Sequence, residues 1–166
     1  ELGVSEVTVT LLTSDTGTSK LVGEYLQAQI QKNLPGVTFK LQPVPLKNRL
    51  ELQRADDFDI FFGTWAPDYQ DPVNFLEQYV TGGGINFANY SSSTYDEAVN
   101  AVKTKYATQP AERYKQMIAA EKIIMDDAIV APIYQASQSY LLAENVDGFE
   151  VLPFGRTINL RQASVK

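Results

Sequence analysis

The stretch from Thr64 to Pro72 holds the residues with the greatest capacity for chemistry. It contains the only Trp of the chain, Trp65, and two carboxylates, Asp68 and Asp71. A carboxylate beside a large aromatic side chain can pair with a cationic group such as an α-amine. Two carboxylates three residues apart can also serve as the acid and base of a glycoside hydrolase, which stays open as an alternative. For Asp71 a structural role is the simpler interpretation, because Asp followed by Pro is typical of a helix start.

The composition excludes several other kinds of chemistry. The 166 residues include no His and no Cys, so there is no Ser-His-Asp or Cys-His nucleophile pair and no zinc site of the usual nitrogen and sulfur type. Any catalysis would have to use carboxylates, Lys, Tyr or Ser. The formal net charge of −6 disfavours nucleic acid and anionic membrane surfaces as partners. No apolar stretch reaches the roughly 18 residues that a membrane-spanning helix needs.

Strands and helices alternate along the first part of the chain. Three strands are predicted, at Val7–Leu12, Val37–Leu41 and Phe58–Gly63, and two helices at 19–33 and 47–54. The first helix carries apolar residues at spacings of three and four: Leu21, Val22, Tyr25, Leu26, Ile30 and Leu34. The alternation predicts an α/β fold with a largely parallel sheet flanked by helices. The third strand is almost continuously apolar, so we expect it at a buried, central position.

The second part of the chain is predicted to be mainly helical. Three helices are expected, at about 71–79, 94–107 and 110–127. The second of them carries the capping pattern of Ser93 and Thr94 followed by Glu97. The apolar run Ile129–Tyr134 predicts a strand whose Pro indicates an edge or a strand end. A further short strand is predicted at 139–142.

The residues around Trp65 resemble the signature of a known family. The run Gly63-Thr-Trp-Ala-Pro-Asp-Tyr-Gln-Asp-Pro-x-x-Phe-Leu76 is similar to that of the oligopeptide- and dipeptide-binding proteins of ABC importers. In that family Trp-x-x-Asp follows a strand and leads into an Asp/Glu-Pro-x-x-Phe helix. The similarity continues at Asn86–Ser91, Tyr95-Asp96 and Ala128–Tyr134 in the family's order and spacing. It covers nearly the whole chain, which resembles the C-terminal portion, or second lobe, of a solute-binding protein of family 5.

The resemblance implies a site for an extended peptide. The fold implied is one lobe of a periplasmic-binding-protein type II fold, in which two lobes close on the ligand. The family's aspartate, matched here by Asp68, pairs with the α-ammonium group of the peptide. Backbone groups at the positions of Thr64 and Ala66 hydrogen-bond the peptide main chain as an added strand would. Trp65 would shape the wall of an adjacent pocket.

Two more residues complete the set of candidate ligand-binding positions. Some relatives carry an Arg three residues before the Trp, where it takes the C-terminal carboxylate of a short peptide. This chain has Phe62 there, which argues against a clamp of fixed length and leaves room for longer peptides or an apolar side-chain pocket. Tyr134 lies where the family approaches the cleft, although sheet packing is the simpler interpretation of that residue.

The function implied is non-catalytic capture of peptides by the extracytoplasmic component of an ABC importer. Its location would be the cell surface, as a lipoprotein, or the periplasm. The implied partners are the peptide and, through the full-length protein, the membrane permease. We expect no catalytic residue, metal, cofactor, nucleic-acid partner or direct insertion into the membrane. A protein-interaction module is a further alternative, which a large apolar patch would support. Residues 1–138 are expected to form a partial second-lobe binding domain, and 139–166 a return segment that packs toward the first lobe in the full protein.

Overall fold

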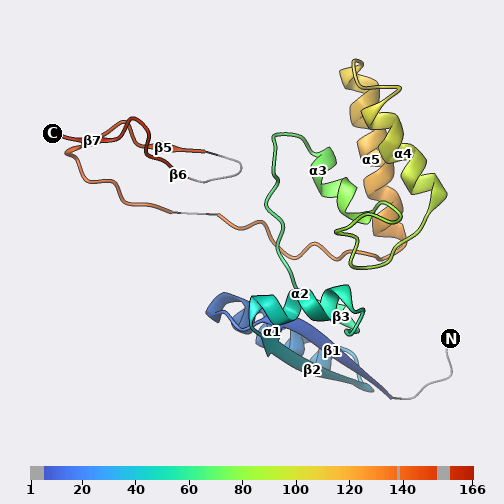
Figure 1. The fold of residues 1–166 in the computed structure, drawn as a ribbon. Coiled ribbons are helices and arrows are strands. Elements are labelled where there is room, and N and C mark those ends of the chain that lie inside the picture. The colour runs from blue at the N-terminus through green and yellow to red at the C-terminus, as the bar shows by residue number, and fades with distance from the viewer. Residues whose placement is uncertain (1–5, 138, 153–157) are drawn as a thin grey trace. The chain divides into compact units, whose positions relative to one another are not determined.

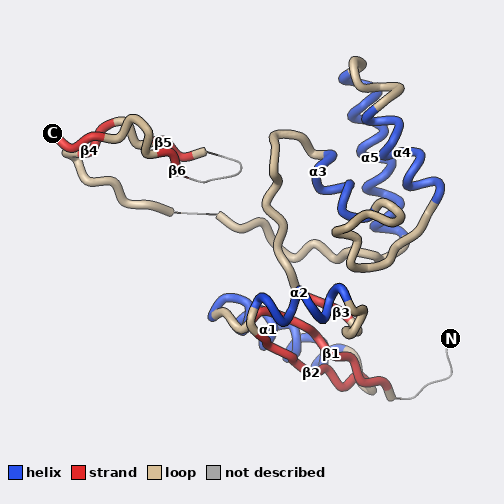
Figure 2. Tube along the Cα trace, in the orientation of Figure 1, coloured by secondary structure: helices blue, strands red, loops and turns tan. Residues whose placement is uncertain are grey.

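The structure is a computed structural model that describes residues 6–137, 139–152 and 158–166. The chain forms two compact units, Glu1–Thr64 and Trp65–Lys166 (Figure 1). The first unit contains a sheet and two helices. The described part of the second contains three α-helices and, toward the C-terminus, short paired strands, whose course can be followed in Figure 2.

The first unit is built on a parallel sheet. Strands β1 (Val7–Ser14), β2 (Val37–Val44) and β3 (Ile60–Phe61) lie in the order β2-β1-β3. The long β1–β2 pair is in register from Val7 opposite Val37 to Ser14 opposite Val44. Helix α1 (Gly17–Asn33) connects β1 to β2, and α2 (Leu46–Arg54) connects β2 to β3. The predicted α/β class with a parallel sheet is therefore confirmed.

The third strand is shorter and less buried than the sequence predicts. Within the described residues β1, rather than β3, is the central strand, and Ile60 and Phe61 are 40% and 36% exposed. One cause lies at the start of β3, where the Asp59 carboxylate accepts a hydrogen bond from the Thr10 backbone N–H at 2.8 Å. This contact uses a donor of β1 that a longer β3 could otherwise have paired. The apolar run thus predicted the strand but not its place in the sheet.

Helix α1 covers the sheet with only part of its predicted apolar face. Val22, Leu26 and Ile30 pack against the buried cluster of Leu11, Phe39 and Phe62. The other three predicted positions, Leu21, Tyr25 and Leu34, are exposed. An apolar stripe wider than the sheet can cover explains this difference, since only one edge of the stripe reaches the strands.

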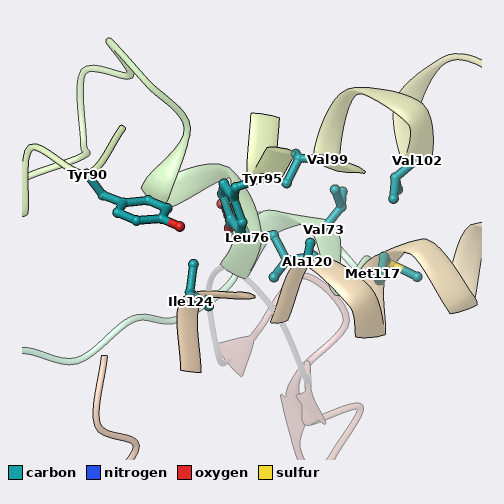
Figure 3. Close-up of a cluster of buried hydrophobic side chains, with 9 residues drawn as sticks. All are labelled: Val73, Leu76, Tyr90, Tyr95, Val99, Val102, Met117, Ala120 and Ile124. Atoms are coloured by element: carbon teal, nitrogen blue, oxygen red, sulfur yellow. Dashed lines mark hydrogen bonds between the residues drawn. The ribbon is translucent and has the colours of Figure 1, made fainter. Parts of the chain in front are cut away.

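The helices of the second unit surround a separate core. They are α3 (Val73–Leu76), followed by the 3₁₀ turn η1 (Glu77–Tyr79), α4 (Ser93–Lys103) and α5 (Pro110–Asp126). Figure 3 shows side chains of α4 and α5 facing one another, with α3 and Tyr90 completing the cluster. Tyr95 is fully buried, and its hydroxyl donates to the Leu76 carbonyl oxygen at 2.6 Å. This bond ties α4 to the end of α3.

The start of α4 differs from the predicted capping pattern. Its N-cap is Ser92, whose hydroxyl oxygen accepts a hydrogen bond from the Tyr95 backbone N–H at 3.3 Å. The predicted cap residues Ser93 and Thr94 lie inside the helix. A run of three Ser residues and one Thr offers several possible caps, and the buried position of Tyr95 selects the one that is used. Helix α5 begins at Pro110, as predicted.

The strands predicted at Ile129–Tyr134 and 139–142 do not form. Residues 130–137 have no regular secondary structure, and Pro132 has no N–H to donate to a neighbouring strand. The strands that do form lie later: β4 (Val146–Asp147) pairs antiparallel with β7 (Ser164–Val165), and β5 (Glu150–Val151) with β6 (Ile158–Asn159). No helix in the described parts of the chain is long and apolar enough to cross a bilayer.

Candidate functional site

The candidate site lies on the connection between β3 and α3. Residues 62–70 lie in neither a helix nor a strand, although the Phe62 backbone N–H still donates to the Leu12 carbonyl oxygen of β1 at 2.8 Å. Thr64 and Ala66 are exposed, and their backbone N–H and C=O groups form no hydrogen bond within the described parts of the chain. Unpaired backbone groups next to a strand end can accept an added strand. This stretch is therefore suited to hydrogen-bonding an extended chain.

Trp65 is half-buried and is held by α3. Its indole Nε1–H donates a hydrogen bond to Asn74 Oδ1 at 2.9 Å. The same oxygen accepts the backbone N–H of Asp68 at 3.1 Å. Asn74 is 5% exposed. One buried amide oxygen thus fixes both the aromatic ring and the backbone of the aspartate that follows it.

The carboxylate of Asp68 is exposed and takes no hydrogen bond or ion pair from any described residue. Its neighbour Tyr69 is held, because the Tyr69 hydroxyl donates to the Glu77 carboxylate, which also accepts from Lys103 Nζ at 2.7 Å. The hydrogen bonds from Lys103 and Tyr69 lower the pKa of Glu77. Burial, together with the bond to Glu77, raises the pKa of Tyr69. The chain next to the Asp68 carboxylate is therefore held by Tyr69, whose hydroxyl already has a hydrogen-bond partner.

Asp71 has the structural role that its position before Pro72 predicts. Its Oδ1 accepts the Val73 backbone N–H at 3.0 Å, and its Oδ2 lies 2.6 Å from Arg113 Nη2 on α5. Burial acts to raise the pKa of Asp71, but the hydrogen bonds from Arg113 and Val73 and the Arg113 charge together lower it. A general acid needs a raised pKa near neutrality. This arrangement gives no support to an acid and base pair of Asp68 and Asp71.

A hollow of about 580 Å³ lies beside this ion pair and is lined by parts of α4 and α5. Its charged lining residues, Asp71, Arg113 and Lys103, all belong to ion pairs already described. The hollow includes none of the six predicted ligand-binding residues. We assign it no ligand.

The remaining predicted residues lie in different settings. The side chain of Phe62 is 7% exposed and packs in the sheet core, while its carbonyl oxygen accepts a hydrogen bond from Arg49 Nη1 at 3.1 Å. Burial lowers the pKa of Arg49. Tyr134 is 49% exposed and lies in the irregular stretch after α5. Phe62 and Thr64 belong to the first unit, and the other four predicted residues belong to the second.

Two residues of this region were not predicted from the sequence. Asn74 occupies an unspecified position in the Asp-Pro-x-x-Phe motif, and its only sequence signal is a polar residue between apolar neighbours in a short helix. Arg49 belongs to none of the sequence motifs described above. Both act through hydrogen bonds to residues distant from them in the sequence, so only the folded chain reveals them.

Solved structures place the fold in a known class. The chain is similar to the substrate-binding domain of an oligopeptide ABC transporter from Bacillus anthracis str. Ames, with a TM-score of 0.89 and 33% identity over 99% of this chain and 32% of that one. It is also similar to Listeria monocytogenes OppA bound to peptide, with a TM-score of 0.84 and 37% identity over 99% of this chain and 31% of that one. The α/β fold is that of one lobe of a type II periplasmic-binding protein.

Sequence comparison gives the family. Residues 1–87 match the family described as Bacterial extracellular solute-binding proteins, family 5 Middle. The Dipeptide-binding protein of Lactococcus lactis subsp. cremoris (strain MG1363) is 32% identical over 100% of this chain and 30% of its own length. The chain belongs to the family 5 bacterial extracellular solute-binding proteins. It spans about 30% of the length of the curated relatives that it matches.

Proposed function

We propose that this chain is the peptide-recognising portion of a longer binding protein that delivers peptides to an ABC importer. The observation that carries the proposal is the exposed Asp68 carboxylate, which has no partner within the described residues and follows a Trp whose ring is fixed. The relatives' names support peptides as the ligand class, since they include a dipeptide-binding protein and an OppA bound to peptide.

The proposed binding mode assigns one task to each part of the site. Asp68 pairs with the α-ammonium group of the peptide. The backbone groups of Thr64 and Ala66 pair with the peptide main chain, which gives affinity without selecting side chains. The Trp65 ring forms an apolar wall. Phe62 brings no charge to its position, so the C-terminal carboxylate of the peptide is not clamped there, and Tyr134 contributes at the periphery.

The protein in this proposal binds without catalysing a reaction. Asp71, the second carboxylate of the segment, is held by Arg113, and Asp68 therefore lacks a second carboxylate in its own segment to act with it. The proposed location is extracytoplasmic, on the cell surface as a lipoprotein or in the periplasm, and the proposed partner is the membrane permease. Residues 1–138 would form part of the second-lobe binding domain, and 139–166 would return toward the first lobe.

The test is calorimetry on the full-length protein with the substitution Asp68→Asn. A hydrogen bond to a charged group contributes about 1.5–3 kcal/mol, so we expect peptide affinity to fall roughly 10- to 150-fold. Asp126→Asn is the matched control, because that carboxylate lies exposed on α5 in a surface ion pair. N-acetylated peptides should bind the wild-type protein weakly and should lose little further affinity in Asp68→Asn. Equal affinity of wild type and Asp68→Asn for a peptide with a free N-terminus would refute the assignment of Asp68.

A further inference from the structure

Asn74 is a buried polar side chain that forms two hydrogen bonds with residues of the candidate site. It lies on α3, is 5% exposed, and accepts two hydrogen bonds on one oxygen, from Trp65 Nε1 and from the Asp68 backbone N–H. An amide oxygen has two lone pairs, so both acceptor sites are occupied. The Asn74 amide also interacts with the Tyr69 hydroxyl, whose pKa it acts to lower. A single side chain thus forms hydrogen bonds with two residues of the segment 65–69.

The two hydrogen bonds decide what the segment can offer to a ligand. Because the indole N–H of Trp65 is already bonded, the ring presents apolar surface and no donor. Because the Asp68 N–H is bonded to a buried atom, the Cα of Asp68 is fixed while its carboxylate stays exposed. The bond between Tyr69 and Glu77 restrains the chain on the far side of Asp68. The aromatic wall and the backbone that carries the Asp68 charge are therefore held at a constant spacing.

We propose that Asn74 is a positioning residue that sets the distance between the aromatic wall and the backbone of Asp68, whose carboxylate receives the peptide N-terminus. This inference rests on the proposed function. It goes further by assigning the preference for a free N-terminus to the pair Asp68 and Asn74 rather than to Asp68 alone. Asn74 does not touch the ligand. It acts by restricting the conformations of the Trp65 ring and of the Asp68 backbone.

Substitutions at Asn74 separate the effect of its hydrogen-bond acceptor from the effect of its side-chain shape. Asn74→Leu keeps a similar volume and removes the acceptor, which leaves both N–H groups without a partner at a buried position. Asn74→Asp keeps oxygens that can accept from the two N–H groups, and it replaces the amide nitrogen with a second carboxylate oxygen. Asn100→Leu is the matched control, since Asn100 is exposed on α4 and its backbone carbonyl, which the substitution keeps, is the group that accepts from Thr104.

The experiment measures hydrogen exchange and peptide affinity on the same full-length protein. Mass spectrometry resolved to single amides should show the Asp68 amide exchanging at least about fivefold faster in Asn74→Leu, the factor that corresponds to about 1 kcal/mol. Amides of α4 serve as the internal reference for general loss of stability. Calorimetry gives the ratio of affinities for free and N-acetylated peptides. This ratio should fall at least about fivefold in Asn74→Leu. It should stay within about threefold of the wild-type ratio in Asn74→Asp and should not change in Asn100→Leu.

The two readouts keep failure of this inference apart from failure of the proposed function. If the wild-type protein binds no peptide, the proposed function fails, and with it the role in ligand recognition, whatever the exchange data show. If the wild type binds and Asn74→Leu keeps the same ratio of affinities, the positioning role is refuted and the proposed function stands. If Asn74→Asp fails to restore the ratio although α4 and the Asp68 amide both exchange as in the wild type, the hydrogen-bond acceptor is not the property that matters and the inference is refuted.

Discussion

The ion pair between Asp71 and Arg113 should stabilise the helical unit far more than its surface counterparts do. The carboxylate and guanidinium lie 2.6 Å apart, and their side chains are only 26% and 21% exposed. Exposed pairs contribute about 0–1 kcal/mol, whereas loss of one partner of a buried pair costs about 3–5 kcal/mol. A pair that is three-quarters buried should lie between these limits, so we expect Asp71→Asn to lower the free energy of unfolding by about 1.5–3 kcal/mol.

The substitution is chosen so that it removes the charge and little else. The introduced amide would keep an oxygen for the Val73 backbone N–H, and its volume is nearly that of the carboxylate it replaces. A double-mutant cycle with Arg113→Met isolates the interaction between the two side chains. Urea denaturation followed by circular dichroism supplies the four free energies of the cycle.

The control is a pair with the same N···O distance and greater exposure. Lys122 and Asp126 on α5 also lie 2.6 Å apart, but their side chains are 72% and 62% exposed. Their coupling energy should be below about 0.5 kcal/mol. A coupling energy for Asp71 and Arg113 that is no larger than this control would refute the argument that burial decides the strength of the pair.

The pH dependence provides a second check on the same pair. The pKa of Asp71 is lowered from its ordinary value of 3.8 in the folded state, so the unfolded chain binds the proton more tightly. The contribution of Asp71 is therefore fully present above the unfolded pKa and is lost as the pH falls through the folded pKa. The stability difference between wild type and Asp71→Asn should be constant near pH 7 and shrink below about pH 4. A difference that grows on acidification would contradict the assigned direction of the shift.

Two further substitutions test other contacts. Tyr95→Phe leaves the buried Leu76 carbonyl without its donor and should destabilise the chain by about 1–3 kcal/mol in urea denaturation, whereas Tyr114→Phe at an exposed site should change stability by less than about 0.5 kcal/mol. Equal effects would contradict the role of the buried bond. Gly148→Ala should abolish the nuclear Overhauser contacts between β4 and β7, because Gly148 has a φ of +67° and an added Cβ would overlap the Gln162 carbonyl oxygen. Unchanged contacts would show that the backbone there is less constrained.

Local signals in the sequence predicted the helices and strands of the first unit well. They predicted poorly the features that depend on which other segment lies alongside. The helix predicted at 19–33 ends just before Pro35-Gly36, and the helix predicted from 110 begins at Pro110. Both boundaries are set by the residues themselves, and both are confirmed. The place of β3 in the sheet and the absence of a strand at Ile129–Tyr134 depend on which segment lies alongside. An apolar run carries no information about its neighbour, and this is why both predictions were wrong.

The same division applies to the candidate site. Residue type alone drew attention to Trp65, Asp68 and Asp71, and the neighbouring Pro72 separated the structural carboxylate from the other. Asn74 was missed, because its function as an acceptor appears only when α3 brings its amide to two N–H groups of the preceding segment. Periodicity detects the faces of helices and strands, but it does not detect a single buried polar side chain that serves an irregular connection.

The two aspartates of one segment lie in different environments, and this difference matches the proposed division between holding the fold and recognising a ligand. Asp71 receives a backbone N–H and an arginine from within the chain, so its charge is satisfied when the helices pack. Asp68 lies three residues earlier and receives no hydrogen bond on its carboxylate from any described residue, while its backbone is held by Asn74. Ordering the backbone beneath a charge costs conformational freedom, and binding of a cation to that charge can offset the cost. A rigid backbone that carries an unpaired carboxylate therefore supports the proposed pairing of Asp68 with an external ammonium group.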